Sequence, residues 1–132
     1  MNDLLLDTCA FLWLAEGGEL AANARKAIAA GNLKVSLITV WEIANLVRKS
    51  RVTLTMPVAK WFVQAIELME AAIIELTVDI LAGSCELPGT PPSDPADRII
   101  IATAREAQAM LVTRDRQILA YSHFGYVRTM AC

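Results

Sequence analysis

Short apolar segments with strand character alternate with longer helical segments along the chain, and this alternation most constrains its fold. The predicted strands are rich in Leu, Val and Ile and cover residues 4–6, 33–37, 72–76 and 110–113, with a fifth candidate at 126–129. Short apolar runs bounded by turn or capping residues are typical of strands that are buried on both faces.

Helices are predicted between these strands from apolar spacing and capping signals. They are expected over residues 8–15, 19–30 and 39–49, from Pro57 through Met69, after Thr77, from 95 to about 109, and after Asp115. Gly31 is a natural end for the second of these helices. Trp61, Ala65, Leu68 and Met69 are expected to share one face of the fourth. The proline-rich segment 87–95 is predicted to be an ordered loop.

Strands that alternate with helices in this way predict an α/β fold, a three-layer sandwich with a central, mainly parallel sheet. The 132 residues suffice for one core, and no break in composition divides them. We therefore expect a single domain over residues 1–132. In such folds functional side chains gather beyond the carboxyl ends of the strands.

The sequence argues against a membrane or secreted protein. No apolar run approaches the roughly 20 residues that span a bilayer. The N-terminal apolar run has no preceding Lys or Arg and contains Asp3 and Asp7, which a secretion signal would lack. Cys9, Cys85 and Cys132 are odd in number and form no CxxC pair, which favours reduced thiols. A cytoplasmic location is expected.

Four acidic residues occupy positions that this fold brings to one edge of the sheet. Asp7 follows the first strand, and Asp115 comes two residues after the fourth. Glu42 lies near the start of the helix that follows the second strand, and Asp97 lies in the first turn of the helix that begins at Pro95. Because all four stand at strand ends or helix starts, a parallel sheet would direct them into one cleft.

Each acid also has a purely structural interpretation. Glu42 is three residues after Thr39, which makes a capping box. Asp97 gains from the dipole of its helix. Asp7 and Asp115 can cap the helices that follow them. The combination favours function, because caps would also be drawn from Ser, Thr and Asn, whereas all four positions carry carboxylates.

Converging carboxylates raise one another's pKa and are costly at neutral pH unless a cation lies among them. Oxygen ligands without Cys or His point to Mg²⁺ or Mn²⁺. Such an ion supports hydrolysis of phosphodiester bonds. His123 is the one histidine, which disfavours a metal-free ribonuclease, and zinc, P-loop and dinucleotide-binding motifs are absent from the sequence.

Four segments in this order resemble the motifs of PIN domains, and specifically of VapC-type toxins from type II toxin–antitoxin systems. They are Leu4-Leu5-Leu6-Asp7-Thr8, Ser36-Leu37-Ile38-Thr39-Val40-Trp41-Glu42-Ile43-Ala44, Asp94-Pro95-Ala96-Asp97-Arg98 with the helix that follows, and Leu111-Val112-Thr113-Arg114-Asp115. Their order and spacing extend over almost the whole chain.

The resemblance implies a ribonuclease whose metal site consists of Asp7, Glu42, Asp97 and Asp115, with Thr113 and Thr8 as polar neighbours. Family members cleave RNA, often tRNA, with Mg²⁺ or Mn²⁺. They commonly form homodimers, and a cognate VapB-type antitoxin inhibits them. The sequence departs from the family pattern at Pro92, where many relatives have a basic residue, and at Ala96, where they have an aromatic one. These departures bear on substrate choice. Asp94 is interpreted mainly as a helix cap with an outer role at the site.

The net charge of −2 opposes RNA binding unless a metal neutralises the clustered acids. Six basic residues are candidates for contact with RNA phosphates. They are Arg48, Lys49, Arg51, Arg98, Arg114 and Arg116. The aromatic residues are divided between the core and a groove for a partner helix or second subunit. They include Phe11, Trp13, Trp41, Trp61 and Phe62.

Two other functions stay open at this stage. A receiver-like signalling domain, with one phosphorylated Asp, would require paired acids after the first strand and a Lys after the last, and the sequence lacks both. A PIN-like domain that only binds a partner is disfavoured by the presence of all four acids. The sequence does not specify the RNA target, the antitoxin, the oligomeric state or the number of metal ions.

Overall fold

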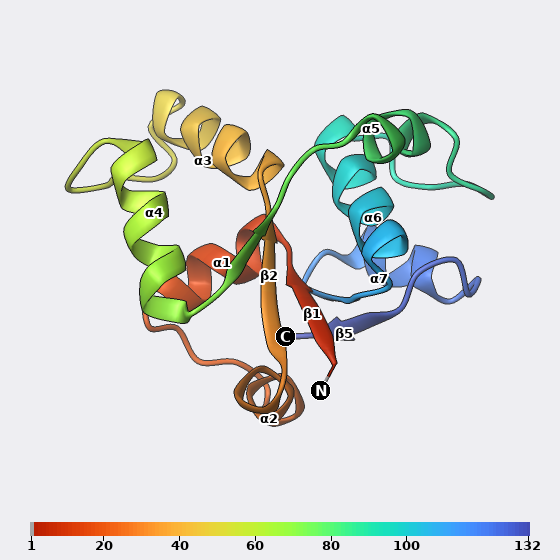
Figure 1. The fold of residues 1–132 in the computed structure, drawn as a ribbon, viewed down its shortest axis with the longest axis horizontal. Helices are drawn as coiled ribbons and strands as arrows, with labels where there is room; N and C mark the ends of the chain where they lie inside the picture. Colours follow the sequence, from red (N-terminus) through yellow and green to blue (C-terminus); the bar gives the residue numbers. More distant parts are fainter. Residues whose placement is uncertain (1) are drawn as a thin grey trace.

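The computed structural model describes residues 2–132, and this part of the chain forms five strands and seven helices (Figure 1). In chain order the elements are β1 (Asp3–Leu6), α1 (Thr8–Ala15), α2 (Ala22–Ala30), β2 (Asn32–Ser36), α3 (Ile38–Arg48), α4 (Val58–Met69), β3 (Ala72–Ile74), α5 (Val78–Cys85), α6 (Pro95–Ala107), β4 (Met110–Thr113), α7 (Arg116–Ser122) and β5 (Thr129–Ala131).

The strands form one sheet in the order β3-β2-β1-β4-β5, and all four neighbouring pairs are parallel. The chain builds outward from β1 to β2 and β3, and then crosses back to add β4 and β5 on the other side. The boundary between β1 and β4 is therefore the topological switch point, where α/β sheets bind their ligands. A receiver-like domain has the order 2-1-3-4-5, so this topology excludes that alternative.

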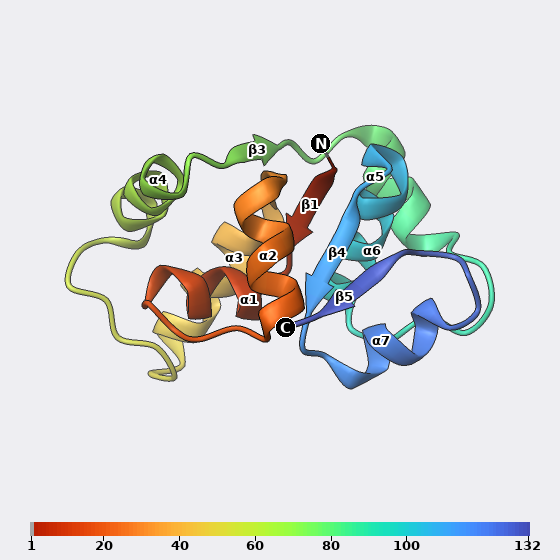
Figure 2. The same ribbon diagram turned by 90° about the horizontal axis from the view of Figure 1, so that it is seen from below.

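Helices cover both faces of the sheet, which confirms the predicted three-layer α/β/α sandwich (Figure 2). Leu4 and Leu6 of β1 point into a core shared with α1, α3 and α4, whereas Leu5 points into the opposite core with α6 and α7. This division follows from the two-residue period of a strand. In the first core the Phe11 ring lies 5.4 Å from the ring of Phe62 and 5.9 Å from that of Trp61, between centroids.

Two predicted segments begin later than expected because tertiary contacts hold the preceding residues out of regular structure. The second helix was expected from Glu19 but begins at Ala22, and the Glu19 carbonyl instead accepts hydrogen bonds from Trp13 and Arg114. The last strand was expected at 126–129 but covers Thr129–Ala131. The Tyr126 carbonyl accepts a hydrogen bond from Arg105, outside the ladder with β4.

Smaller differences occur at the ends of three other elements. The strands β2 and β3 end at Ser36 and Ile74 rather than at 37 and 76, and α6 ends at Ala107 because Gln108 adopts a left-handed conformation with φ of 53°. Leu68 was assigned to the buried face of α4 but is 86% exposed. It lies one residue outside the packed stripe formed by Trp61, Ala65 and Met69.

None of the helices formed by residues 2–132 has the length and apolar character needed to cross a membrane. The three cysteines are free, and Cys9 and Cys85 are exposed.

The buried aromatic cluster around Phe11 gives a test of the fold. Phe11 is completely buried, so Phe11→Ala should lower the free energy of unfolding by about 3–5 kcal/mol. Leu68→Ala, which truncates an exposed residue, should change it by less than about 0.5 kcal/mol. Urea titration followed by circular dichroism measures both values. Equal losses for the two variants would contradict the assigned core.

Candidate metal centre

Five carboxylates stand at the carboxyl edge of the sheet, on both sides of the β1–β4 boundary. Asp7 is the N-cap of α1 directly after β1, and Asp115 is the N-cap of α7 after β4. Glu42 lies in the second turn of α3, which follows β2. Asp94 is the N-cap of α6, and Asp97 lies in its first turn. The doubly wound topology thus collects acids from four separate segments.

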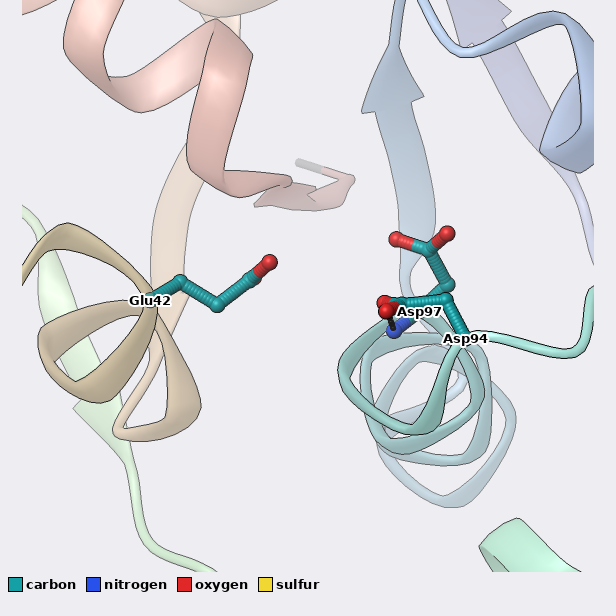
Figure 3. A group of neighbouring side chains, drawn as sticks. All are labelled: Glu42, Asp94 and Asp97. Carbon is teal, nitrogen blue, oxygen red and sulfur yellow. Dashed lines mark hydrogen bonds between the residues drawn. The ribbon is translucent and has the colours of Figure 1, made fainter. Parts of the chain in front are cut away.

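Glu42, Asp94 and Asp97 are the most tightly grouped of these acids. One carboxylate oxygen from each lies within 4.8 Å of those of the other two. Glu42 extends from α3 toward the start of α6, where the two aspartates lie (Figure 3). Asp94 also performs its predicted capping role, because its Oδ2 accepts a hydrogen bond of 3.0 Å from the backbone N–H of Asp97. Its membership of this group exceeds the outer role expected from sequence.

Asp7 and Asp115 lie outside this closest group and are tied to each other through Thr113. The hydroxyl of Thr113 donates to Asp7 Oδ2 and accepts a 3.0 Å hydrogen bond from the backbone N–H of Asp115. Both acids also cap helices as their positions suggested. Asp7 Oδ1 accepts from the N–H of Ala10, and Asp115 Oδ1 accepts from the N–H groups of Gln117 and Ile118. Asp7 is only 5% exposed, so its charge is held inside the protein.

Glu42 is held by a different pair of hydroxyls, and the expected capping box does not form. The helix α3 begins at Ile38, whose N–H donates to Ser36 Oγ, so Thr39 already lies inside the first turn. Thr8 donates a 2.5 Å hydrogen bond to Glu42 Oε1, and Thr39 Oγ1 lies 3.1 Å from Thr8 Oγ1. The structural interpretation of Glu42 as a cap is therefore wrong.

Burial raises the pKa values of the acids, and the negative charges of neighbouring carboxylates add to the effect. Desolvation, followed by the negative charges of Asp94, Asp115, Glu42 and Asp7, raises the pKa of Asp97 to about 7. Burial raises the pKa of Asp7 and of Glu42 as well, although hydrogen bonds from Thr113 and Thr8 oppose the increase. Burial and the negative charge of neighbouring acids oppose ionisation of each carboxyl group. Protons or a cation bound among the acids would therefore stabilise the group.

The pKa of the Cys9 thiol in α1 is affected by the same acids. Although Cys9 is exposed, partial desolvation by the surrounding protein raises the pKa of its thiol most, and the negative charges of Asp7, Glu42, Asp115 and Asp97 raise it further. All four acids singled out in the sequence therefore act on one neighbouring group.

The donor set fits a hard divalent cation. Every grouped ligand atom is a carboxylate oxygen, which matches Mg²⁺ and Mn²⁺ rather than zinc. Desolvation and the neighbouring negative charges raise the pKa values of Glu42 and Asp97. A bound cation would offset both effects, because it stabilises the ionised carboxylates. The residues present thus fit such an ion on their chemistry as well as on their spacing.

The basic residues fall into two sets. Arg98 and Arg114 adjoin the acids, but both are engaged: Arg98 Nε donates to the Pro92 carbonyl, and Arg114 donates to the Glu19 and Cys132 carbonyls. The guanidinium of Arg114 also lies 4.4 Å from the centre of the Trp13 ring. Arg116 is exposed at the start of α7.

The other three basic residues are exposed at the far end of α3, where the helix stops. They are Arg48, Lys49 and Arg51. Arg48 lies six residues beyond Glu42, about 9 Å along the helix axis. This set is therefore set back from Glu42 along α3.

Of the five aromatic residues named in the sequence analysis, Trp13 is 39% exposed and Trp41 is 59% exposed. Phe11 and Phe62 are core residues, and Trp61 packs partly against them. The positions that depart from the family pattern, Pro92 and Ala96, are both buried. The backbone carbonyl of Pro92 accepts a hydrogen bond from Arg98, beside Asp97.

The sheet is parallel and doubly wound, and carboxylates gather at its switch point. These two features place the chain among α/β domains with an acidic site. The PIN domain model matches residues 4–123. The chain is also 38% identical, over 125 residues, to ribonuclease VapC22 of Mycobacterium tuberculosis strain ATCC 25618 / H37Rv, covering 93% of this chain and 95% of that protein. The chain therefore belongs to the PIN-domain family, and the resemblance to VapC-type members is confirmed.

Solved structures show the same fold at low identity. The DNA-bound VapBC of Salmonella typhimurium contains a chain with a TM-score of 0.68 and 16% identity, covering 99% of this chain and 98% of that one. The promoter-bound VapBC2 of Rickettsia felis gives 0.67 and 14%, with 98% of each chain covered. VapBC-5 of Mycobacterium tuberculosis gives 0.65 and 15% over the full length of both chains.

The raised pKa of Asp97 predicts a specific pH dependence of stability. Between the ordinary value of 3.8 and about 7, the folded protein holds a proton on Asp97 that the unfolded chain has released. The folded state therefore binds more protons, and the stability of the metal-free protein should fall as the pH rises through this window.

Asp97→Asn removes this effect, so in the presence of chelator its Tm should exceed that of the wild type by about 2–4 °C at pH 8, with the gap closing toward pH 4. Differential scanning calorimetry across the range measures the gap. A gap that does not change with pH would show that Asp97 is not perturbed.

Proposed function

We propose that this chain is a metal-dependent endoribonuclease toxin of the VapC type. The observation that carries the proposal is the convergence of carboxylates from β1, α3, α6 and β4 at one edge, with Glu42, Asp94 and Asp97 within 4.8 Å of one another. The name of the 38% identical relative, a ribonuclease, supports the same activity.

Asp7, Glu42, Asp97 and Asp115 are proposed as the catalytic, metal-holding acids, and the position of Asp94 adds it to the set. A bound Mg²⁺ or Mn²⁺ would supply a water of lowered pKa and positive charge opposite the scissile phosphate. The protein's contribution is orientation. Thr113 fixes Asp7 and Thr8 fixes Glu42. Backbone N–H groups at the helix starts fix the side chains of Asp94 and Asp115. Acids held in this way need little reorganisation when a cation binds.

RNA is the proposed substrate, with tRNA a candidate because VapC-type proteins often cleave it. Exposed Arg116 at the edge of the acids and Arg48, Lys49 and Arg51 at the end of α3 are proposed to contact flanking phosphates. Arg98 and Arg114 keep this role only through the donors that their carbonyl contacts leave free.

A VapB-type antitoxin is the proposed inhibitor. The related folds include chains of the VapBC structures from Rickettsia felis and Salmonella typhimurium. An apolar groove of about 380 Å³ between α1 and α4, lined by Leu14, Met56, Trp61 and Leu68 among others, has the character of a surface that receives a partner helix. A homodimer is also proposed, with exposed Trp41 a candidate for burial on assembly.

A catalytically inactive PIN-like binding module is the alternative. Asp97→Asn tests it, because this change removes a proposed metal ligand while keeping the backbone cap from Asp94. Cleavage of a tRNA mixture in Mn²⁺ should fall by at least about 100-fold, measured on denaturing gels. Asp79→Asn, which alters an exposed acid in the first turn of α5, should retain wild-type cleavage.

Chelator should abolish cleavage by the wild type, and added Mn²⁺ should restore it. Cleavage that survives in Asp97→Asn or in chelator would overturn the metal-dependent mechanism. Intact RNA of every class after incubation with wild-type protein in Mn²⁺, while the protein still binds a partner, would favour the inactive module.

A further inference from the structure

A buried pair of hydroxyls links α1 to α3 directly beneath Glu42. Thr8 is 5% exposed and Thr39 is completely buried, and their Oγ1 atoms lie 3.1 Å apart. Thr8 donates to Glu42 Oε1 at 2.5 Å. Neither the PIN-family acids nor the capping pattern in the sequence requires a hydroxyl at position 39, because Thr39 does not cap α3.

The direction of these hydrogen bonds follows from the number of protons. A threonine hydroxyl has one proton to donate, and ionised Glu42 can only accept. The hydroxyl proton of Thr8 is donated to Glu42. The 3.1 Å hydrogen bond between the two threonine Oγ1 atoms can therefore form only if Thr39 donates to Thr8. Thr39 therefore donates to Thr8, and Thr8 donates to Glu42. Hydrogen bonds in such a chain polarise and strengthen one another.

We infer that Thr39 is a positioning residue that acts on Glu42 through Thr8 and so strengthens binding of a divalent cation by the acidic group. This inference rests on the proposed metal-dependent function. Glu42 has less support of this kind than Asp7, Asp94 and Asp115 have. Asp7, Asp94 and Asp115 are fixed by backbone N–H groups as well, whereas among residues 2–132 Thr8 is the hydrogen-bond donor to Glu42.

Loss of the Thr39 hydroxyl would affect Glu42 in two ways. Thr8 would lose its donor and become free to turn its own proton elsewhere, for example toward a backbone carbonyl. The longer Glu42 side chain would then sample several rotamers, and a cation would have to fix it on binding. Outer hydrogen bonds of this kind typically change metal affinity by about 10–100-fold.

The test measures Mn²⁺ binding by calorimetry on the purified full chain without RNA. Thr39→Val keeps the shape of the side chain and removes the hydroxyl, and it should weaken Mn²⁺ binding by about tenfold. Thr39→Ser keeps the hydroxyl and should bind within about twofold of the wild type. Thr103→Val is the matched control, because Thr103 is equally buried in a helix but donates to the Ile99 carbonyl. It should leave the affinity unchanged.

A second comparison shows whether Thr39 acts through Glu42. In a Glu42→Ala background, Thr39→Val should have little further effect on Mn²⁺ affinity, because the acceptor at the end of the chain is gone. If Thr39→Val is poorly folded by circular dichroism, Thr39→Ala and Thr39→Ser provide the same contrast.

The outcomes separate the two proposals. Wild-type binding of Mn²⁺ that Asp97→Asn weakens but Thr39→Val does not would overturn the role of Thr39 and leave the metal centre standing. Equal weakening by Thr39→Val and Thr39→Ser would show that packing, not the hydroxyl, matters, and would also overturn it. A wild-type protein that binds no Mn²⁺ would overturn the metal centre and this inference together.

Discussion

Repulsion among carboxylates at one edge of a parallel sheet is the interaction on which the rest of this structure depends. Five acids from four segments meet there, and their negative charges add to desolvation in raising the pKa of Asp97 to about 7. The fold limits this cost with neutral donors rather than with nearby ion pairs. Threonine hydroxyls and the N–H groups of helix starts stabilise negative charge without filling the space between the acids. Under the proposed function, this leaves room for a cation among the acids.

Thr113 and Thr39 perform related tasks on the two sides of the β1 strand. The Thr113 hydroxyl accepts a hydrogen bond from the backbone N–H of Asp115 and donates one to Asp7. Thr39 stands behind Thr8, which donates to Glu42. Both threonines are completely buried, so their hydroxyls have few competing partners in water. A hydroxyl is suited to this position because it can accept and donate at once, which an amide or an alkyl side chain cannot do through a single atom.

The sequence predicted what local signals determine. Asp94 followed by Pro95 identified the start of α6, and the apolar triplet Leu4-Leu5-Leu6 identified β1. The start of α2 and the position of β5 were wrong because they depend on contacts with distant arginines, Arg114 and Arg105. A capping role also does not exclude a place in the acidic group. Asp7 caps α1 with Oδ1, whereas its Oδ2 accepts the hydrogen bond from Thr113. No local pattern distinguishes these cases.

The arrangement of charge also bears on how a chain with a net charge of −2 can approach RNA. The guanidinium groups beside the acids are held by carbonyls: Arg98 by Pro92, and Arg114 by Glu19 and Cys132. This anchoring prevents them from collapsing onto the carboxylates and neutralising them, which would compete with a cation. With a cation in the centre, the fixed arginines would add to a positive field that attracts a phosphate. Without the cation, the same arginines surround negatively charged carboxylates, which repel the phosphate. Under the proposed function, metal binding would then control RNA binding as well as hydrolysis.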